Sequence, residues 1–314
     1  MSILITGAAG FIGAALLRRL AAIPGGEPVI GLDRRALADC PAQGSFHLGD
    51  IRDGAALRGL FQQVRPRVVV HLASVVAAGG DAALDYAIDV GGTENVLQAC
   101  QAAGVRRLVV TSSGAAYGYH ADNPVPLCET DAVRGNEDFP YARNKRLVEE
   151  MLARWRQMQP ALEQVVFRPC TVLGPGVANQ ITAIFERPLI TGLLGASTPF
   201  SFVAESDVVG ALHHATALQG AGPAGIYNLA GDGALTLRQI AARIGKPYLA
   251  IPPAVMRGAL WAANRLGLTS LGPAQVLFLQ YRPVLDNTRL KAQFGYVPAY
   301  DSAAAFDRYW QARA

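Results

Sequence analysis

The stretch Ile3-Leu4-Ile5-Thr6-Gly7-Ala8-Ala9-Gly10-Phe11-Ile12-Gly13 decides the fold that this sequence predicts. Residues 2–6 are typical of a short buried strand, and residues 14–20 have the apolar spacing of a helix. The three glycines between them suit a tight turn, a close backbone approach to a pyrophosphate, and close packing of the helix on the strand. The first N–H groups of that helix would face the phosphates. The sequence therefore predicts a dinucleotide-binding turn at its start.

The second expected strand, residues 28–32, ends next to Asp33. A carboxylate about twenty residues after the glycines can accept hydrogen bonds from both hydroxyls of the adenosine ribose. This favours NAD, because the 2′-phosphate of NADP would meet a negative charge. Arg34 and Arg35 follow directly and could hold that phosphate, so NADP is not excluded. A turn residue at a strand end would look the same as Asp33.

Strands and helices continue to alternate along the chain. Strands are expected at 45–48, 67–72 and 107–111, and helices up to residue 64 and over 84–103. This alternation predicts an α/β fold, a doubly wound parallel sheet with helices on both faces.

Ligands of such sheets bind beyond the carboxyl ends of the strands. Polar or small residues follow several expected strands there, namely Gly7, Asp33, Asp50, Ala73 and Ser113. Asp50 could accept a hydrogen bond from the adenine amino group or cap the following helix, and the sequence leaves both open.

Tyr141 and Lys145 are four residues apart in a segment expected to be helical, so they would share one helix face. An ammonium beside a phenol favours the ionised phenol by Coulomb attraction. A phenol tuned in this way can take a proton from an alcohol or return one to a ketone. The spacing alone also fits an ordinary solvated helix face, but together with the glycine turn it indicates a catalytic pair.

The bulk composition excludes several classes of protein. Of 314 residues, 51% are hydrophobic and 17% charged, which provides for a large core and argues against disorder. The net charge of +4 is spread without a long Lys/Arg run, so a nucleic-acid partner is not expected. The four cysteines are scattered, which predicts no metal site and reduced thiols in a cytoplasmic protein. No apolar run reaches transmembrane length.

These features resemble the extended short-chain dehydrogenase/reductases, the NAD-dependent epimerase/dehydratase family. The resemblance covers roughly the first 180 residues. The matching segments are 6–13, Asp33, 49–51, 71–73, 91–93, 111–113 with Tyr117-Gly118, 141–145, and Arg168-Pro169 with Gly174-Pro175.

The resemblance implies a Rossmann domain over residues 1–175 and a smaller mixed α/β substrate lobe over 176–314, interleaved with it. It implies that Tyr141 is the general acid/base, that Lys145 tunes it and holds the nicotinamide ribose, and that Ser113 orients the substrate oxygen. It also implies an NAD contact from these further residues: Gly7, Gly10, Phe11, Ile12, Gly13, Asp33, Arg34, Asp50, Ile51, Leu72, Ala73, Ser74, Thr111, Arg168 and Pro169. Thr111 could be an ordinary strand residue or a cofactor contact. Arg168 and Pro169 would lie near the nicotinamide amide and contact it through their backbone groups.

Departures from the family pattern narrow the chemistry. Gly114-Ala115 replace the acidic pair of the dehydratases, so dehydration is set aside. Thr171 stands where nucleotide-sugar members usually carry Asn, and Phe200 where they often carry a diphosphate-binding Arg. Arg187 or Arg282 could supply that cation instead, because a buried diphosphate needs one.

Asp89 stands where members of the family usually carry Asn, so the hydrogen bonding of the local helix is expected to differ from theirs. In the substrate lobe, residues 179–187, which begin with Asn179, are expected to be helical and to contribute to substrate binding.

The leading hypothesis is an NAD-dependent oxidoreductase that interconverts a secondary alcohol and a ketone. The alternatives are a nucleotide-sugar 4-epimerase with the same site and, from a different class, a non-catalytic dinucleotide sensor. A homodimer is expected through the helices at 84–103 and 141–157, which carry extra apolar residues. The apolar stretch 251–279 fits ordinary core or a dimer surface, an apolar substrate mouth, or a membrane-touching surface.

Overall fold

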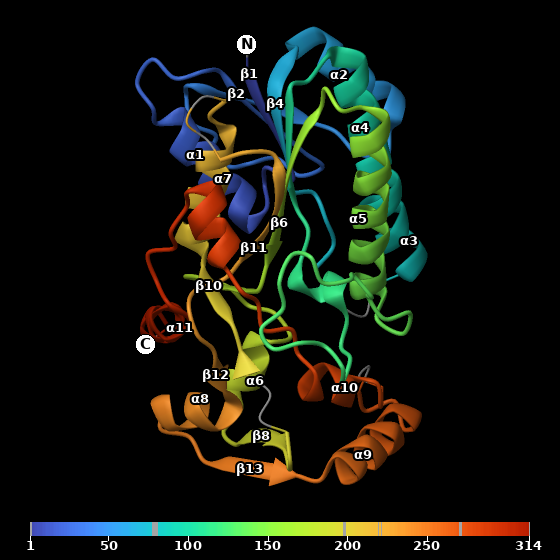
Figure 1. Ribbon diagram of the computed structural model, residues 1–314, viewed down its shortest axis with the longest axis vertical. Helices are drawn as coiled ribbons and strands as arrows, with labels where there is room; N and C mark the ends of the chain where they lie inside the picture. Colours follow the sequence, from blue (N-terminus) through green and yellow to red (C-terminus); the bar gives the residue numbers. More distant parts are fainter. Residues whose placement is uncertain are drawn as a thin grey trace.

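The computed structural model describes residues 2–76, 81–196, 199–218, 220, 222–269 and 272–313. In this part of the chain, the largest sheet has seven strands, and every neighbouring pair is parallel (Figure 1). Its strand order is β11-β6-β5-β4-β1-β2-β3. The strands are β1 (Ser2–Thr6), β2 (Val29–Asp33), β3 (Gly44–Leu48), β4 (Pro66–His71), β5 (Arg107–Thr111), β6 (Glu163–Pro169) and β11 (Gly225–Leu229).

Helices cover both faces of this sheet, which confirms the predicted doubly wound fold. One face carries α1 (Phe11–Ala21) and α7 (Glu205–Thr216), and the two helices contact each other. The other face carries α2 (Gly54–Val64), α4 (Gly92–Ala103) and α5 (Pro140–Met158). α4 continues from α3 (Ala82–Tyr86) through a π-helical turn, η1 (Ala87–Gly91). Each face has its own apolar core, because alternate residues of the strands point to opposite sides.

The sequence order of the strands reverses at β1, since β2 and β3 lie on one side of it and β4, β5 and β6 on the other. In open α/β sheets a crevice forms at such a reversal, beyond the carboxyl ends of the strands. The glycine turn after β1 therefore lies at the predicted ligand position.

The remaining short strands and helices form a smaller lobe, most of which lies below the main sheet in Figure 1. Its two-stranded sheets pair β7 (Thr171–Leu173) with β10 (Phe202–Ala204), β9 (Pro199–Phe200) with β12 (Leu235–Thr236), and β8 (Ile190–Leu193) with β13 (Tyr248–Ile251). Its helices are α6 (Thr182–Glu186), α8 (Leu237–Arg243), α9 (Pro253–Arg265), α10 (Gln275–Gln280) and α11 (Ser302–Gln311). The π-helical turn η3 (Leu290–Phe294) packs instead against β11 of the main sheet. The lobe's core is aromatic and includes Phe185, Phe200, Phe202 and Phe306.

The structure differs from the sequence-based expectations in two places in this lobe. The helix expected over 179–187 covers only Thr182–Glu186, because the Asn179 side chain accepts hydrogen bonds from the amides of Ile181 and Thr182 and caps the turn before it. Ordinary core is the wrong interpretation for α9, which has no buried residue. No helix in the described ranges is both long and apolar enough to cross a membrane.

Candidate active site

The glycine turn is shaped by close backbone approaches. Gly7 has φ +70°, and a Cβ there would lie 2.6 Å from the amide nitrogen of Ala73. A Cβ on Gly13 would lie 2.2 Å from the carbonyl oxygen of Gly7. Helix α1 begins directly after Gly10, and no side chain caps its amino terminus. The first N–H groups of α1, including those of Phe11 and Ile12, are thus available to an anion, and the turn fits a dinucleotide pyrophosphate.

Asp33 lies at the end of β2, against the glycine turn. Its Oδ2 accepts a hydrogen bond from the amide of Ala9 at 3.0 Å, and its Oδ1 accepts one from the amide of Arg35 at 3.0 Å. The carboxylate is therefore fixed beside the expected ribose position rather than turned away.

Asp50 forms ion pairs with Arg52 at 2.5 Å and with Arg34 at 3.4 Å. Hydrogen bonding to Arg52 holds the pKa of the Asp50 carboxyl below its ordinary value. The helix-cap interpretation of Asp50 is wrong, because Asp53 caps α2 by accepting from the amides of Ala55 and Ala56. A hollow of about 290 Å³ lies beside Asp50, between the ends of β2 and β3 and helix α2. Ile51 is buried and packs against Gly92 of α4.

A buried hydrogen-bond chain links β1, β4 and the start of α4. The Thr93 hydroxyl donates to the carbonyl oxygen of Asp89, so it accepts from Nε2 of His71 at 3.0 Å. Nδ1 of His71 then accepts from the hydroxyl of Thr6 at 2.7 Å. These roles require a neutral imidazole, and burial accordingly lowers the pKa of His71 to about 3, with a further contribution from the Lys145 ammonium. The chain fixes the strand ends that carry Leu72 and Ala73.

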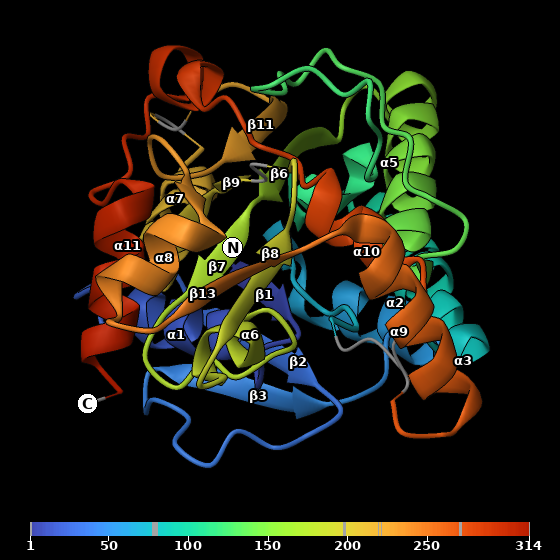
Figure 2. The same ribbon diagram turned by 90° about the horizontal axis from the view of Figure 1, so that it is seen from below.

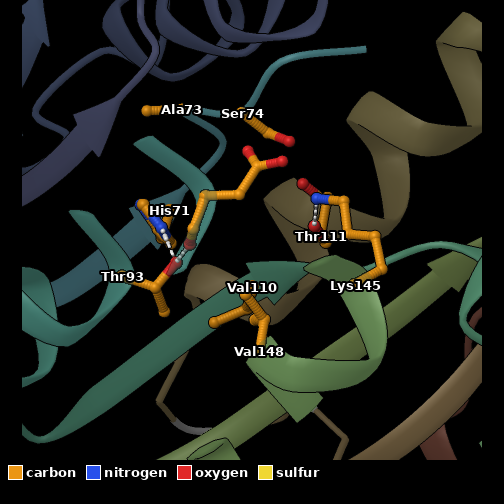
Figure 3. Close-up of a pocket in the computed structure, with 9 residues that line it drawn as sticks. His71, Ala73, Ser74, Thr93, Val110, Thr111, Lys145 and Val148 are labelled. Carbon is orange, nitrogen blue, oxygen red and sulfur yellow. Dashed lines mark hydrogen bonds between the residues drawn. The ribbon is translucent and has the colours of Figure 1, made fainter. Parts of the chain in front are cut away.

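Lys145 lies at a small cavity of about 10 Å³, which has room for about one water molecule (Figure 3). Its Nζ donates to the main-chain oxygen of Thr111 at 3.3 Å and lies 5.5 Å from the centre of the Tyr141 ring. Lys145 is only 5% exposed, and no ion pair among the described residues includes it. The ammonium is thus buried beside the phenol on one face of α5.

Two further polar groups line the same cavity. Ser74 Oγ and Asp89 Oδ2 are buried and have no hydrogen-bond partner among the described residues. The other oxygen of Asp89, Oδ1, accepts from the amide of Val75 at 3.0 Å. Asp89 belongs to the π-helical turn η1, so the departure from the family's Asn coincides with an irregular helix turn.

The two neighbouring serines after β5 have different surroundings. Ser112 is buried and donates to Oε1 of Glu149 at 2.6 Å. Ser113 caps the short 3-10 helix η2 (Gly114–Tyr117), where its Oγ accepts from the amide of Ala115 at 3.1 Å. Its hydroxyl proton remains available for a substrate oxygen. η2 packs against α5, the helix that carries Tyr141.

The Arg168 side chain is committed to the protein interior. It donates to both carboxylate oxygens of Glu149, to the hydroxyl of Tyr117 at 2.7 Å and to the main-chain oxygen of Glu129 at 3.2 Å. Only backbone groups of this segment therefore remain for a cofactor. The carbonyl of Pro169 lies next to Gly114 at the start of η2.

The smaller lobe brings together three of the predicted substrate residues. Arg282 donates from Nη2 to Oγ1 of Thr171 at 2.7 Å, and its guanidinium carbon lies 4.1 Å from the centre of the Phe200 ring. The ring of Phe278 in α10 also lies close, with its centre 4.4 Å from the same guanidinium carbon. Nη1 of Arg282 is buried without a hydrogen-bond partner among the described residues. Burial lowers the pKa of Arg282 to about 10, which still leaves it charged at neutral pH.

Aromatic side chains link this arginine to the predicted catalytic residue Tyr141. Phe278 packs edge-on against Tyr119, with ring centres 5.2 Å apart, and Tyr119 interacts electrostatically with both Arg282 and Tyr141. Phe278 and Tyr119 were not anticipated from the sequence, because no local pattern marks either residue. Asn179 and Arg187, by contrast, are both exposed at the two ends of α6. Asn179 is used as a local cap and is not brought to the other predicted substrate residues.

Comparisons with known proteins agree with this architecture. The sequence model described as "NAD dependent epimerase/dehydratase family" matches residues 3–230, and the chain belongs to that family. An uncharacterized protein of Mycobacterium tuberculosis is 29% identical over 99% of this chain and 84% of its own length. The UDP-glucose 4-epimerase of Erwinia amylovora is 30% identical over 58% of this chain and 56% of that protein.

Solved structures of the same fold cover the whole chain. UDP-glucose 4-epimerase of Thermotoga maritima, solved with UDP-glucose, has a TM-score of 0.76 at 22% identity and covers 100% of this chain and 98% of its own. UDP-glucose 4-epimerase of Thermus thermophilus, solved with NAD, has a TM-score of 0.73 at 26% identity and covers 99% of both chains. The predicted fold and family are confirmed, and the protein is an enzyme of an NAD-dependent family.

Proposed function

We propose that this enzyme transfers a hydride reversibly between nicotinamide and a secondary alcohol or ketone, with Tyr141 as general acid/base. The observation that carries the proposal is the buried Lys145 ammonium, 5.5 Å from the Tyr141 ring and without an ion-pair partner in the described residues. A buried cation beside a phenol favours the phenolate, which is the form that takes the proton of an alcohol.

Each residue has a separate task in this mechanism. Ser113 donates a hydrogen bond to the substrate oxygen and orients it, while Tyr141 takes the hydroxyl proton in the oxidative direction and returns it in the reductive one. Lys145 stabilises the phenolate and donates to the ribose. When bound, NAD supplies the hydride acceptor or donor. The glycine turn, with Asp33 fixed beside it, is the proposed site of the pyrophosphate and the adenosine ribose.

The geometry also supports a substrate with an anionic group. A buried guanidinium with an unpaired Nη1 is unfavourable unless an anion joins it. Phosphate and carboxylate oxygens are the acceptors that fit a planar guanidinium. We therefore assign Arg282 and Thr171 to binding that group, with the rings of Phe200 and Phe278 packed against the guanidinium.

A second candidate function is the 4-epimerisation of a nucleotide sugar at the same site. It is favoured by Arg282, since the diphosphate of such a substrate would satisfy the unpaired guanidinium. Similar proteins include UDP-glucose 4-epimerases. In an epimerase the hydride returns to the same substrate, so NAD is not consumed, whereas the dehydrogenase produces NADH.

The test is turnover of the purified full chain with NAD, assayed against UDP-glucose, UDP-galactose, steroids and small hydroxy acids. NADH formation supports the dehydrogenase, and interconversion of the sugars without NADH supports the epimerase. Tyr141→Phe should lower turnover at least about a hundredfold, the usual scale for a positioned acid/base. Tyr300→Phe, which changes a tyrosine just before α11 that accepts a hydrogen bond from Arg308, is the matched control. NAD binding without any turnover would instead favour a dinucleotide sensor.

A homodimer in the cytoplasm is part of the proposal. The helices α3 and α5 lie against each other, and Leu84 and Tyr86 of α3 are exposed apolar side chains at this surface. A four-helix bundle between two copies would cover them. Sedimentation should give a dimer at micromolar concentration, and Leu84→Glu should shift it toward the monomer. A wild-type monomer would reject this assembly.

A further inference from the structure

The outer tip of the substrate lobe has an unusual distribution of charge. Between Asp232 and Asp286 the sequence contains no Asp or Glu and six Lys or Arg. This stretch includes β13 and the whole of α9, which lies at the outer edge of the lobe next to α10 (Figures 1 and 2). The adjoining strand β8 is also free of acidic residues. Of the six, Arg282 is buried between aromatic rings and Arg243 pairs with Asp307 of α11. The other four, Arg238, Lys246, Arg257 and Arg265, have no ion pair among the described residues and leave the tip positive.

The same tip exposes large apolar side chains. Trp261 is 57% exposed, and Leu266 and Leu268, which follow α9, are 72% and 76% exposed. Val255 of α9 is exposed as well. Helix α9 contains no buried residue, and its partly covered positions, such as Met256 and Leu260, lie on one side of it. Isolated exposed apolar residues are ordinary, but several of them on one outer helix and its exit indicate an interaction surface.

Arg257, Trp261 and Arg265 are spaced four residues apart and form one stripe along α9. The guanidinium of Arg265 lies 5.7 Å from the centre of the Trp261 ring. Neither arginine takes part in an ion pair within the described ranges. A tryptophan flanked by arginines suits the boundary between lipid headgroups and acyl chains. The indole ring can contact both regions there, and the guanidinium groups can reach the phosphates.

We propose that α9 and the residues after it, 253–269, form a peripheral docking surface for a bilayer that contains anionic lipids. Apolar side chains would enter the interface and the arginines would pair with headgroup phosphates. Charge decides between this partner and a second copy of the chain, because two copies joined at this tip would bring their cations together. The surface is separate from the catalytic residues, so the proposal does not depend on the reaction.

The experiment is flotation of the purified full chain with vesicles of phosphatidylcholine alone or mixed with phosphatidylglycerol, at low and high salt. We expect binding to the mixed vesicles, weakened by salt, and a blue shift of tryptophan emission that Trp261→Phe abolishes. Arg257→Gln with Arg265→Gln should weaken binding about twenty-five-fold, at about fivefold for each cation near an anionic surface. Trp261→Ser should also weaken it.

Matched controls separate this surface from general stickiness. Val297→Ser and Arg18→Gln, an exposed apolar and an exposed basic residue elsewhere, should bind as the wild type does. Because α9 has no buried residue, the variants should keep wild-type thermal unfolding. Absence of binding to mixed vesicles, or equal binding by the Arg variants, overturns the proposal. A change of oligomeric state in Trp261→Ser would assign the surface to a second copy instead.

Discussion

The guanidinium carbon of Arg282 lies over the ring of Phe200, 4.1 Å from its centre. By the sequence resemblance, Phe200 stands where nucleotide-sugar members of the family often carry a diphosphate-binding arginine. The structure thus brings a cation from a distant part of the chain directly onto the position where the local one is missing. Arg187, the other candidate from the sequence, is exposed at the end of α6.

Arg282→Met should therefore weaken binding of an anionic substrate without destabilising the fold. The KM for an anionic substrate should rise about ten- to hundredfold, the scale of a lost hydrogen bond to a charged group. The free energy of unfolding should stay unchanged or rise, because the variant removes a buried cation without a carboxylate partner. Arg187→Met is the control, and steady-state kinetics with denaturant unfolding provide both readouts. A larger KM effect in the control would move the anion site to Arg187.

Asp33 should set the preference between the two dinucleotides. Its carboxylate is held against the glycine turn by the amide of Ala9, while Arg34 is drawn toward Asp50. NAD should bind more tightly than NADP by about 1–3 kcal/mol, because the 2′-phosphate would meet the carboxylate. Asp33→Asn should narrow that difference. Calorimetry that gives equal or tighter binding of NADP to the wild type would mean that Arg34 or Arg35 controls the site.

Lys145→Met should lower turnover and weaken NAD binding together, because the ammonium serves both the phenol and the ribose. Tyr141→Phe should affect turnover alone. Lys291→Met, which removes a partly exposed lysine paired with Asp232, is the matched control. Fluorescence titration with NADH measures the cofactor affinity of each variant. Unchanged cofactor affinity in Lys145→Met would remove the ribose contact from the mechanism.

Residue spacing along the sequence could predict those parts of the site whose residues lie close together in the chain. The glycine turn, Asp33 and the Tyr141–Lys145 pair are recognisable because their function depends on spacing within one strand, turn or helix. The sequence left the role of Asp50 open because Asp50 and Asp53 both precede α2. In the structure Asp53 caps the helix, and Asp50 forms ion pairs with Arg34 and Arg52 outside it.

The substrate side could not be predicted in the same way. Contact between Arg282 and Phe200 depends on how α10 packs against the short strands of the lobe, and nothing in either local sequence encodes it. The apolar composition of α9 is that of a core helix, and only its position at the edge of the lobe exposes it.

The buried pair of Glu149 and Arg168 should be essential for folding rather than for chemistry. Both side chains are 4% exposed, and the pair also holds Ser112 and Tyr117. Glu149→Gln should lower the free energy of unfolding by about 3–5 kcal/mol, because it leaves a buried guanidinium without its counterion. Glu150→Gln, one residue along and paired with Arg146 at the surface, should change it by less than about 1 kcal/mol. Denaturant titration compares the two, and equal effects would contradict this assignment.

The stability of the enzyme should fall in mild acid because of His71. Its pKa is lowered by burial to about 3 in the folded chain, against about 6.5 in an unfolded one. Below about pH 6.5 the unfolded chain binds a proton at His71 that the folded chain does not bind. The contribution of neutral His71 to stability is therefore complete above that pH and is lost as the pH falls toward 3. Between pH 6.5 and 4.5 the loss from this one group should be about 2–3 kcal/mol.

His71→Gln should be less stable at pH 7, since Thr6 and Thr93 lose their hydrogen-bond partner, yet its stability should change less with pH. His47→Gln on the edge strand β3 is the control. Parallel losses in the wild type and His71→Gln would show that other groups cause the acid sensitivity.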